Sequence, residues 1–171
     1  GEQDILFGGD IEKWRAFANT LKLRAYLRLS QVDPPKAQAG IAALYATSPV
    51  FLTEDASIAY TTTGGNDNPL YNEMVGLGRT QNLVASGTAV QQFNKNNDPR
   101  VFKYYQPNIT VGTDVPEDTI AYIPQGTYRA NTLKRVSSPS ALVGGRATDP
   151  QSALAPVKLI SAAESYFLQA E

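Results

Sequence analysis

The chain has 171 residues, of which 42% are hydrophobic and 18% charged, and its formal net charge is −1. This balance is typical of an ordinary globular domain, so it favours neither disorder nor a nucleic-acid partner. Histidine and cysteine are both missing from the sequence. That excludes serine–histidine triads, histidine-ligated zinc, thiolate metal sites and cysteine nucleophiles within it, and we expect no catalytic, metal-binding or cofactor-binding group.

A long helix is predicted near the N-terminus, over residues 11–31. Asp10 is placed to cap it, and apolar side chains recur at helical spacing at Trp14, Phe17, Ala18, Leu21 and Ala25. A second set, Leu23, Tyr26 and Leu27, widens the apolar surface. Its basic residues scatter around the helix, so we interpret them as solvated charges on stems that cover apolar neighbours. Asp33 before Pro34 predicts a second helix, joined to the first as an antiparallel hairpin.

Two long segments are expected to be irregular, at about 48–84 and 106–157. Turn-forming residues dominate both, and loops of this length are uncommon in a compact domain unless they carry function. A short alternating stretch around Ile120 and Tyr122 is a candidate strand within the second segment.

Shorter helices are predicted elsewhere. One covers residues 87–94 after Ser86, with Val90 and Phe93 inward, and another starts at Asp98 and Pro99 as cap and first turn. Ser161 with Glu164 three residues later is a capping-box pattern. It predicts a last helix that buries one apolar face, made of Ala163, Phe167 and Ala170.

Several clusters of polar residues lack the pattern of a metal-binding or catalytic site. Asp67 lies between Asn66 and Asn68, which are oxygen ligands that calcium accepts, but the ordered spacing and distal glutamate of an EF-hand are missing. We interpret this stretch as a turn. The adjacent carboxylates Glu54–Asp55 and Glu117–Asp118 are interpreted as solvated loop charges, because adjacency does not predict the roughly 5–9 Å separation of a glycosidase pair.

Tyrosines in polar surroundings are the candidate ligand contacts. Aromatic residues on the predicted helices, including Trp14, Phe17, Phe93 and Phe167, are assigned to the core. A ring in a Gly/Pro/Asn-rich loop can instead stack on the apolar face of a ligand ring. The candidate binding residues are therefore Tyr71, Tyr122 and Tyr128.

Three stretches together resemble, in order and spacing, the SusD/RagB family of outer-membrane nutrient-binding lipoproteins. In that family a Gly–Asp pair precedes a helix reading approximately K-W-x-K-F-A-N-T-L-K-L-R, a DPR motif follows, and a helix of the form A-E-x-x-F-L-x-A-E comes later. The matching stretches are GGDIEKWRAFANTLKLRAYLRLSQVDP (8–34), NNDPRVFKYY (96–105) and LISAAESYFLQAE (159–171). Arg15 and Ala16 depart from the pattern. These are scaffold motifs, so no ligand residue carries over from the family.

The resemblance implies a mainly α-helical protein with tetratricopeptide-like helix pairs, long irregular loops and little strand. It implies an outward-facing lipoprotein of the outer membrane, held by an N-terminal lipid anchor that lies outside this sequence. Such proteins capture oligosaccharides, or in some members peptides, and pass them without catalysis to a SusC-type TonB-dependent transporter. Asn19 would then bond an adjacent chain segment rather than a ligand.

Family members run to several hundred residues. We therefore expect residues 1–171 to be a single SusD-like region, from the middle-to-C-terminal portion of a longer protein. Apolar surface on the Trp14 helix and on the last helix should then be exposed when this region stands alone.

Two alternatives stay open at this point. A helical-repeat adaptor would bind a protein partner through an extended helical surface, which the long irregular segments disfavour. A glycoside hydrolase with paired carboxylates would cleave a polysaccharide and lose that activity on a single Asp or Glu substitution.

Overall fold

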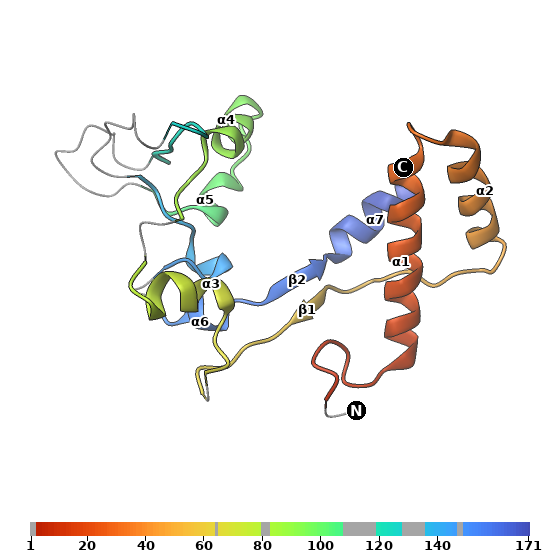
Figure 1. Ribbon diagram of the computed structural model, residues 1–171, viewed down its shortest axis with the longest axis horizontal. Coiled ribbons are helices and arrows are strands. Elements are labelled where there is room, and N and C mark those ends of the chain that lie inside the picture. Colours follow the sequence, from red (N-terminus) through yellow and green to blue (C-terminus); the bar gives the residue numbers. More distant parts are fainter. Residues whose placement is uncertain (1–2, 64, 80–82, 108–118, 128–135, 147–148) are drawn as a thin grey trace. The chain divides into compact units, whose positions relative to one another are not determined.

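The computed structural model describes residues 3–63, 65–79, 83–107, 119–127, 136–146 and 149–171, which belong to two compact units (Figure 1). Unit 1 comprises residues 1–59 and 157–171, and unit 2 comprises residues 60–156. The predicted mainly α-helical class is confirmed, and the described strands form one two-stranded sheet. Within these ranges no helix combines the length and hydropathy needed to cross a bilayer. That the residues form a single region of a longer protein stays a prediction.

Unit 1 begins with a helical hairpin of α1 (Ile11–Leu29) and α2 (Pro34–Tyr45). The Asp10 carboxylate accepts hydrogen bonds from two backbone N–H groups in the first turn of α1. Asp33 accepts one in the same way for α2, where Pro34 occupies the first position. Both predicted caps are confirmed, and each satisfies backbone donors that a helix start leaves without an intrahelical acceptor.

The buried side of α1 agrees with the prediction in part, since the core includes Phe17, Leu21, Leu23 and Leu27. It carries Ala16, Thr20 and Leu23, whereas Ala18 and Ala25 are exposed. The prediction counted apolar spacing alone. The buried side also follows the chain segment that α1 contacts, where Thr20 supplies a hydrogen-bonding hydroxyl.

The segment in question is residues 50–52, which lies along α1. The buried hydroxyl of Thr20 accepts a hydrogen bond from the backbone N–H of Leu52 at 3.0 Å. The Asn19 amide donates to the backbone carbonyl of Val50 at 3.0 Å. The expectation that Asn19 bonds an adjacent chain segment is confirmed.

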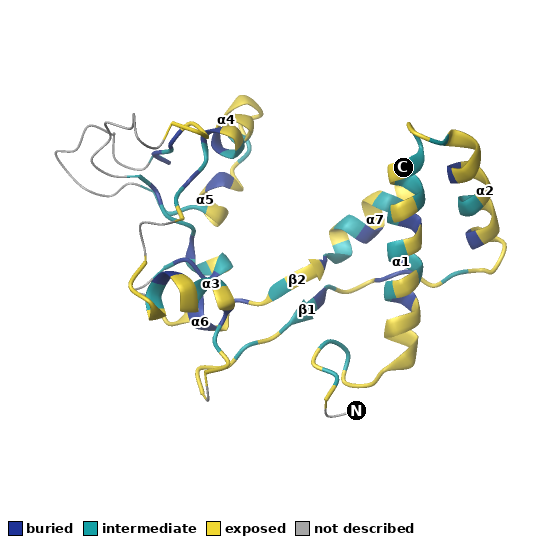
Figure 2. Cartoon of the chain, viewed as in Figure 1, coloured by how far each residue is buried: buried dark blue, intermediate teal, exposed yellow. Residues whose placement is uncertain are grey.

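Two apolar clusters fill unit 1 around this contact (Figure 2). The first joins both helices of the hairpin to the last helix and consists of Leu23, Leu44 and Phe51, with Leu27, Ile41 and Leu168 packed against them. The second lies towards the sheet and consists of Ala16, Leu52, Ala56 and Ile160, with Leu6, Phe7, Phe17 and Leu21 around it.

The two ends of unit 1 meet in an antiparallel pair of strands, β1 (Ala56–Ile58) and β2 (Val157–Ile160). Helix α7 (Ala162–Ala170) follows β2, and the Ser161 hydroxyl oxygen accepts a hydrogen bond from the backbone N–H of Glu164 at 3.0 Å, as predicted. The Glu164 carboxylate lies 3.1 Å from the Arg24 guanidinium, which ties α7 to α1.

The predicted inward face of α7 is wrong. Phe167 is 76% exposed, and Ala163 and Ala170 are exposed as well. The side that faces α1 carries buried Ser165 and core-packed Leu168. The orientation of α7 is set by the Arg24–Glu164 ion pair and by Leu168, which leaves the predicted apolar face open to solvent.

Unit 2 is built from short elements. Those inside the two segments predicted to be irregular are α3 (Pro69–Tyr71), the π-helix η1 (Asn72–Gly76), the 3₁₀-helix η3 (Ala141–Val143) and α6 (Gln151–Leu154). Between these segments lie α4 (Gly87–Lys95) and α5 (Val101–Tyr104), which match the two predicted helices.

The predicted caps of these two helices are confirmed only in part. Ser86 occupies the cap position of α4, but its side chain makes no capping hydrogen bond. The Asp98 carboxylate accepts a hydrogen bond from the backbone N–H of Arg100 at 3.0 Å and forms an ion pair with the Arg100 side chain. Helix α5 begins at Val101, two residues after the predicted first position Pro99, and its cap residue is Arg100, so the predicted cap at Asp98 is wrong.

Backbone hydrogen bonds hold the irregular segments of unit 2 together. Ala85 donates to the carbonyl of Ser137 at 2.7 Å and accepts from the N–H of Ile123 at 3.1 Å, and Gly87 donates to the carbonyl of Ile123 at 2.8 Å. The predicted strand around Ile120 is instead an isolated bridge between Ser86 and Ile123 in the described residues. Ala85, Val90, Val101 and Ile120 form the core beneath.

Asn68 is a structural centre of unit 2. Its side-chain oxygen accepts from the N–H groups of Leu70 and Tyr71, at 2.8 and 3.1 Å, and caps α3. Its side-chain nitrogen donates to the carbonyl of Ala155 at 2.6 Å. Because this buried amide is occupied by the backbone, Asn68 is no free cation ligand, which agrees with the interpretation of its stretch as a turn.

Gly145 offers a test of how tightly unit 2 is packed. A Cβ at this position would lie 2.6 Å from the backbone oxygen of Pro139, so Gly145→Ala requires backbone movement. We expect a loss of about 1–3 kcal/mol in the free energy of unfolding, measured by denaturant titration. Gly76→Ala is the control, because its Cβ would meet only the tip of the exposed Asn72 side chain, which is free to move. An equal cost for both variants would contradict the prediction.

Candidate functional site

Tyr122 lies in unit 2, half-buried beside the start of α4. A Cβ at Gly87, the first residue of α4, would lie 3.1 Å from the Tyr122 ring and 3.2 Å from the Cα of Pro124. Glycine at this position therefore makes room for the ring to lie over the helix. The ring also packs against the unit 2 core, which holds it in place.

One polar side chain bonds the Tyr122 hydroxyl, and a second polar pair lies at the same end of α4. The Gln91 amide donates to the Tyr122 hydroxyl at 3.3 Å, and the Thr88 hydroxyl lies 3.5 Å from the side-chain oxygen of Gln125. Thr88, Gln91 and Gln125 are exposed. We call these four residues, Thr88, Gln91, Tyr122 and Gln125, the Tyr122 patch. It combines a fixed aromatic ring with neutral amide and hydroxyl groups that both donate and accept hydrogen bonds.

The other predicted tyrosines are placed differently. Tyr71 ends α3, half-buried, and its N–H is taken by Asn68. No ring contact joins Tyr71 to Tyr122 in the part of the chain that the structure describes. Tyr128 lies outside the described residues. Of the two candidates within the described residues, Tyr122 is the one whose hydroxyl has a polar side-chain partner, Gln91. That any of the three tyrosines binds a ligand stays a prediction.

Sequence reasoning missed the polar members of the patch. Thr88 and Gln91 are three residues apart on α4, so the sequence was sufficient to predict that they lie on the same face of the helix. Gln125 was not, because it reaches α4 through the irregular segment after Ile123.

The adjacent carboxylates of unit 1 form ion pairs. Glu54 lies 2.5 Å from the Lys13 ammonium, and Asp55 lies 2.6 Å from Lys158 while also accepting from the N–H of Ala162. The hydrogen bond from Lys158 lowers the pKa of Asp55. A glycosidase general acid requires the opposite shift, so Asp55 does not fit that role. Its bonds to Lys158 and Ala162 hold β2 and the start of α7. Glu117 and Asp118 lie outside the described residues.

The described residues hold no cluster of three or more acidic side chains that could bind a metal ion.

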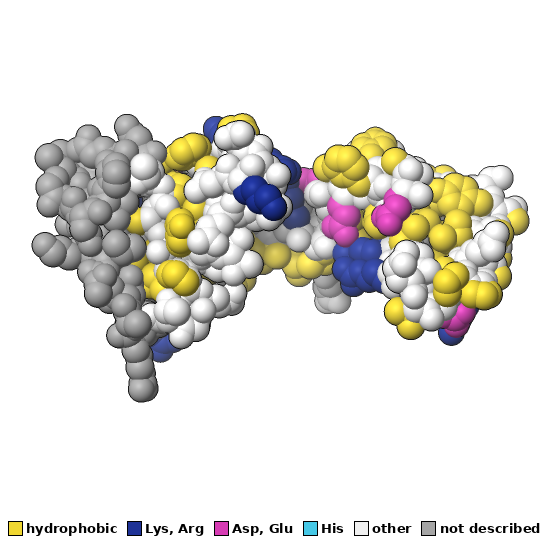
Figure 3. All heavy atoms as spheres, turned by 90° about the horizontal axis from the view of Figure 1, so that it is seen from above, with side chains coloured by type: hydrophobic (Ala, Val, Ile, Leu, Met, Phe, Trp, Pro, Cys, Tyr) yellow, Lys and Arg dark blue, Asp and Glu magenta, His cyan; other side chains and the backbone are white. Residues whose placement is uncertain are grey.

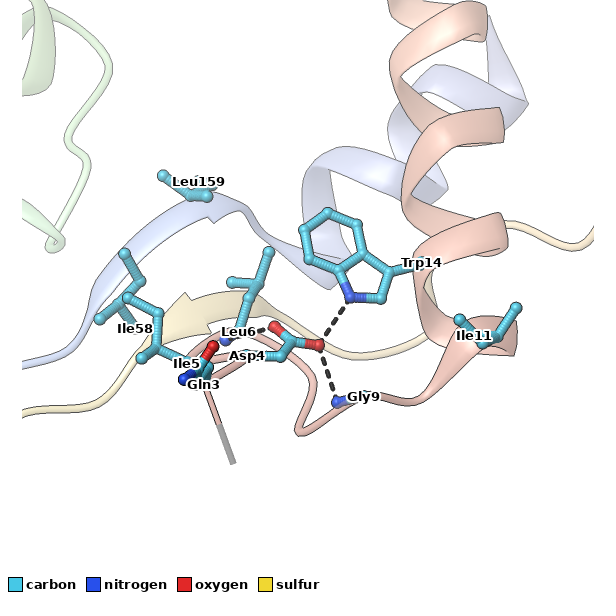
Figure 4. A pocket seen from close by; sticks show the side chains of 9 residues that line it. All are labelled: Gln3, Asp4, Ile5, Leu6, Gly9, Ile11, Trp14, Ile58 and Leu159. Atoms are coloured by element: carbon cyan, nitrogen blue, oxygen red, sulfur yellow. Dashed lines mark hydrogen bonds between the residues drawn. The ribbon is translucent and has the colours of Figure 1, made fainter. Parts of the chain in front are cut away.

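Unit 1 contains a separate hollow of about 700 Å³ (Figure 4). It lies between the segment of residues 3–9, the first turn of α1 and the two strands. Its apolar lining is Ile5, Leu6, Ile11, Trp14, Ile58 and Leu159, and its polar side chains are Gln3 and Asp4.

Asp4 uses its whole acceptor capacity within the fold. One carboxylate oxygen accepts from the N–H groups of Leu6 and Phe7, at 3.1 and 3.2 Å. The other accepts from the Gly9 N–H and the Trp14 indole N–H, both at 2.7 Å (Figure 4). A carboxylate offers about four lone-pair sites, so no acceptor is left for a bound hydroxyl.

Trp14 is fixed in the same arrangement. Its ring makes edge-to-face contacts with Phe7 and Phe17, at centroid distances of 5.2 and 5.8 Å. With its N–H taken by Asp4 and its ring packed on two phenylalanines, Trp14 is a structural clamp at the start of α1. The hollow is consequently an apolar surface and a poor site for a polyhydroxyl ligand.

Comparisons with known proteins give a consistent result. A SusD-like family model described as "Starch-binding associating with outer membrane" matches residues 1–171. A search of curated proteins returned no match.

Three solved structures illustrate the likeness, and each covers 98% of this chain. A chitin-binding protein is 22% identical with a TM-score of 0.70, a likeness of fold alone. A SusD homolog from Bacteroides vulgatus is 25% identical with a TM-score of 0.66, and a SusD-like protein from Bacteroides thetaiotaomicron is 30% identical with a TM-score of 0.56. The chain spans 36%, 32% and 32% of their respective lengths, about a third.

The Asp4 clamp predicts a pH-dependent stability. The hydrogen bond from Trp14, helped by backbone N–H groups, lowers the pKa of Asp4 to about 2. A carboxyl whose pKa is lowered by folding stabilises the fold at pH values above the pKa that it has in the unfolded chain, about 3.9. This contribution to stability is lost as the pH falls towards 2, the pKa in the folded chain. Asp4→Asn should lower the unfolding midpoint at pH 7, and the difference from the parent chain should shrink between pH 4 and pH 2.

The measurement is thermal unfolding followed by the fluorescence of Trp14, the one tryptophan in the sequence. Asp10→Asn is the matched control, because asparagine caps a helix about as well as aspartate. A difference between Asp4→Asn and the parent that stays constant down to pH 2 would show that the carboxylate charge is not what stabilises the clamp.

Proposed function

The chain belongs to the SusD-like family described as starch-binding and associating with the outer membrane, and we propose that it binds oligosaccharides at the cell surface as part of a nutrient uptake system. The family match over the whole sequence supports the class of ligand. The Tyr122 patch is the observation that supports a location for it.

The proposed mechanism is capture without chemistry. The face of the Tyr122 ring stacks on the apolar face of a pyranose, and the neighbouring amide and hydroxyl groups of Gln91, Gln125 and Thr88 bond the sugar hydroxyls. A single stacking contact contributes about 1 kcal/mol, so the dissociation constant is expected in the micromolar to millimolar range. Weak binding suits a protein that must release its ligand again.

The absence of catalysis is part of this proposal. Asp55 is one of the two adjacent carboxylates of unit 1. Its pKa is lowered by the hydrogen bond from Lys158, with which it forms an ion pair. Asp55 therefore does not fit the general acid of a glycoside hydrolase, and the family match supports a binder.

The partner and the location are also proposed. We assign the transport step to a SusC-type TonB-dependent transporter, to which this protein delivers the oligosaccharide. An N-terminal lipid anchor would hold it on the outer face of the outer membrane. The family description, which names an association with that membrane, supports this assignment.

Substitution of the ring tests the proposed site. Tyr122→Ala should weaken oligosaccharide binding about fivefold, the equivalent of about 1 kcal/mol of stacking. Tyr122→Phe keeps the ring and should bind nearly as well as the parent chain. The measurement is calorimetry with the best ligand from a glycan array that includes malto-oligosaccharides and chitin oligosaccharides, with a parallel assay for released reducing ends.

Tyr71→Ala is the control variant, since Tyr71 is placed away from the polar side chains of the patch. Equal weakening by Tyr71→Ala and Tyr122→Ala would contradict the assigned location. Failure of every glycan to bind would contradict the proposed ligand class, and release of reducing ends would support a hydrolase instead.

A further inference from the structure

An exposed aromatic ring of unit 2 lies on α5, apart from the Tyr122 patch. Tyr104 is 42% exposed, and its ring stacks on that of Phe93 from α4, with 5.8 Å between the ring centroids and 26° between the ring planes. Phe93 in turn packs against the core of unit 2. Because Phe93 covers one side of the Tyr104 ring, the other side faces solvent as a flat apolar surface that the core supports from behind.

Hydrogen bonds fix the backbone of Tyr104 as well. Its N–H donates to the carbonyl of Arg100 at 3.2 Å, and its carbonyl accepts from the N–H of Ser140 at 2.8 Å. The next residue, Tyr105, forms an isolated bridge with Pro139. A ring that is already held in this way loses little conformational freedom when a ligand stacks on it, so more of the stacking energy is available for binding.

The Arg100 guanidinium places hydrogen-bond donors beside this ring. Arg100 and Tyr104 are four residues apart in one helical turn, so they lie on the same side. The hydrogen bond to Asp98 raises the pKa of Arg100 and Tyr104 adds a smaller electrostatic contribution, so the two side chains lie close together. The Arg100 side chain is 69% exposed. Its Nε and Nη2 atoms donate to Asp98, while its Nη1 group makes no hydrogen bond to another described residue and keeps two donors for a ligand.

This ring and the Tyr122 patch lie on different sides of α4. Gln91 of the patch and Phe93 are two residues apart on the helix, which places them on roughly opposite sides of it. A helix with its side chains is about 10–12 Å across, so one sugar ring cannot contact Tyr104 and Tyr122 at once. Figure 3 shows one face of the molecule, on which hydrophobic side chains and Lys or Arg side chains both reach the surface of unit 2.

The chemistry around Tyr104 indicates the class of ligand. The exposed face of the ring matches the apolar face of a pyranose, and the guanidinium N–H groups match sugar hydroxyl oxygens, whereas a purely apolar ligand would use none of these donors. We propose that Tyr104 and Arg100 form a second oligosaccharide-binding site, independent of the Tyr122 patch. This inference rests on the proposed function for its class of ligand.

Fluorine NMR of the full-length protein, labelled with 3-fluorotyrosine, tests this site directly. The signal of Tyr104 is the one that Tyr104→Phe removes, and that of Tyr122 is the one that Tyr122→Phe removes. The titrants are malto-oligosaccharides, chitin oligosaccharides and any further hit of the glycan array. We expect the Tyr104 signal to shift and to reach saturation, and we expect the same shift in Tyr122→Ala.

Calorimetry measures what the Tyr104 ring contributes. In the Tyr122→Ala background, Tyr104→Ala should weaken the remaining binding about fivefold. Phe102→Ala in the same background is the matched control and should leave binding unchanged. Phe102 is 50% exposed on the same helix, but it is two residues from Tyr104 and lies on the opposite side. Circular dichroism of each variant establishes that the fold is kept.

The outcomes separate this inference from the proposed function. A Tyr104 signal that stays in place while the Tyr122 signal shifts would overturn the second site alone. A Tyr104 shift that disappears in Tyr122→Ala would overturn it too, because both rings would then report one site. Equal weakening by Phe102→Ala and Tyr104→Ala would show that the stacked ring is not what binds. If neither signal shifts with any glycan, the proposed function fails together with the inference.

Discussion

The fold of unit 1 depends on the way α1 fixes the extended segment of residues 50–52. A chain that leaves α2 must satisfy its backbone groups while it crosses a buried surface, and Thr20 and Asn19 provide the partners for Leu52 and Val50. Once this segment is fixed, the chain continues directly into β1. The β1–β2 pair then brings α7, which lies more than a hundred residues further along, back to α1.

Unit 2 also has to pair the backbone groups of irregular segments, and it does so without a long helix. Its backbone groups are paired by isolated bridges and by side chains that bond the main chain, with Asn68 as the clearest case. Short elements held in this way can place a ring and several amides at chosen positions, as the start of α4 does for Tyr122. The arrangement depends on small residues where the segments touch: Gly87 beneath the tyrosine ring and Gly145 against Pro139.

The starts of the capped helices were predictable from neighbouring residues in the sequence. The faces that these helices bury were less predictable, because they depend on contacts with distant segments. The caps at Asp10, Asp33 and Ser161 follow from hydrogen bonds within one turn, which the sequence encodes directly. The buried side of α1 was predicted only in part and that of α7 wrongly, because apolar spacing does not reveal which neighbour a helix contacts. On α1 the deciding contact is a polar one, through Thr20, and on α7 the large apolar side chain of Phe167 faces solvent.

The same distinction separates the family motifs from the candidate site. The matching residues have scaffold roles: Asp10 caps α1, Trp14 clamps Asp4, Asn19 holds Val50, Arg24 pairs with Glu164, and Asp98 pairs with Arg100. Each role requires one particular side chain in one geometry, which is why the motifs are recognisable in sequence. A stacking surface requires only an aromatic ring with polar neighbours, and many arrangements provide it. The residues that identify the family therefore say little about its ligand, and the proposed location of ligand binding, the Tyr122 patch, has no distinctive sequence pattern of its own.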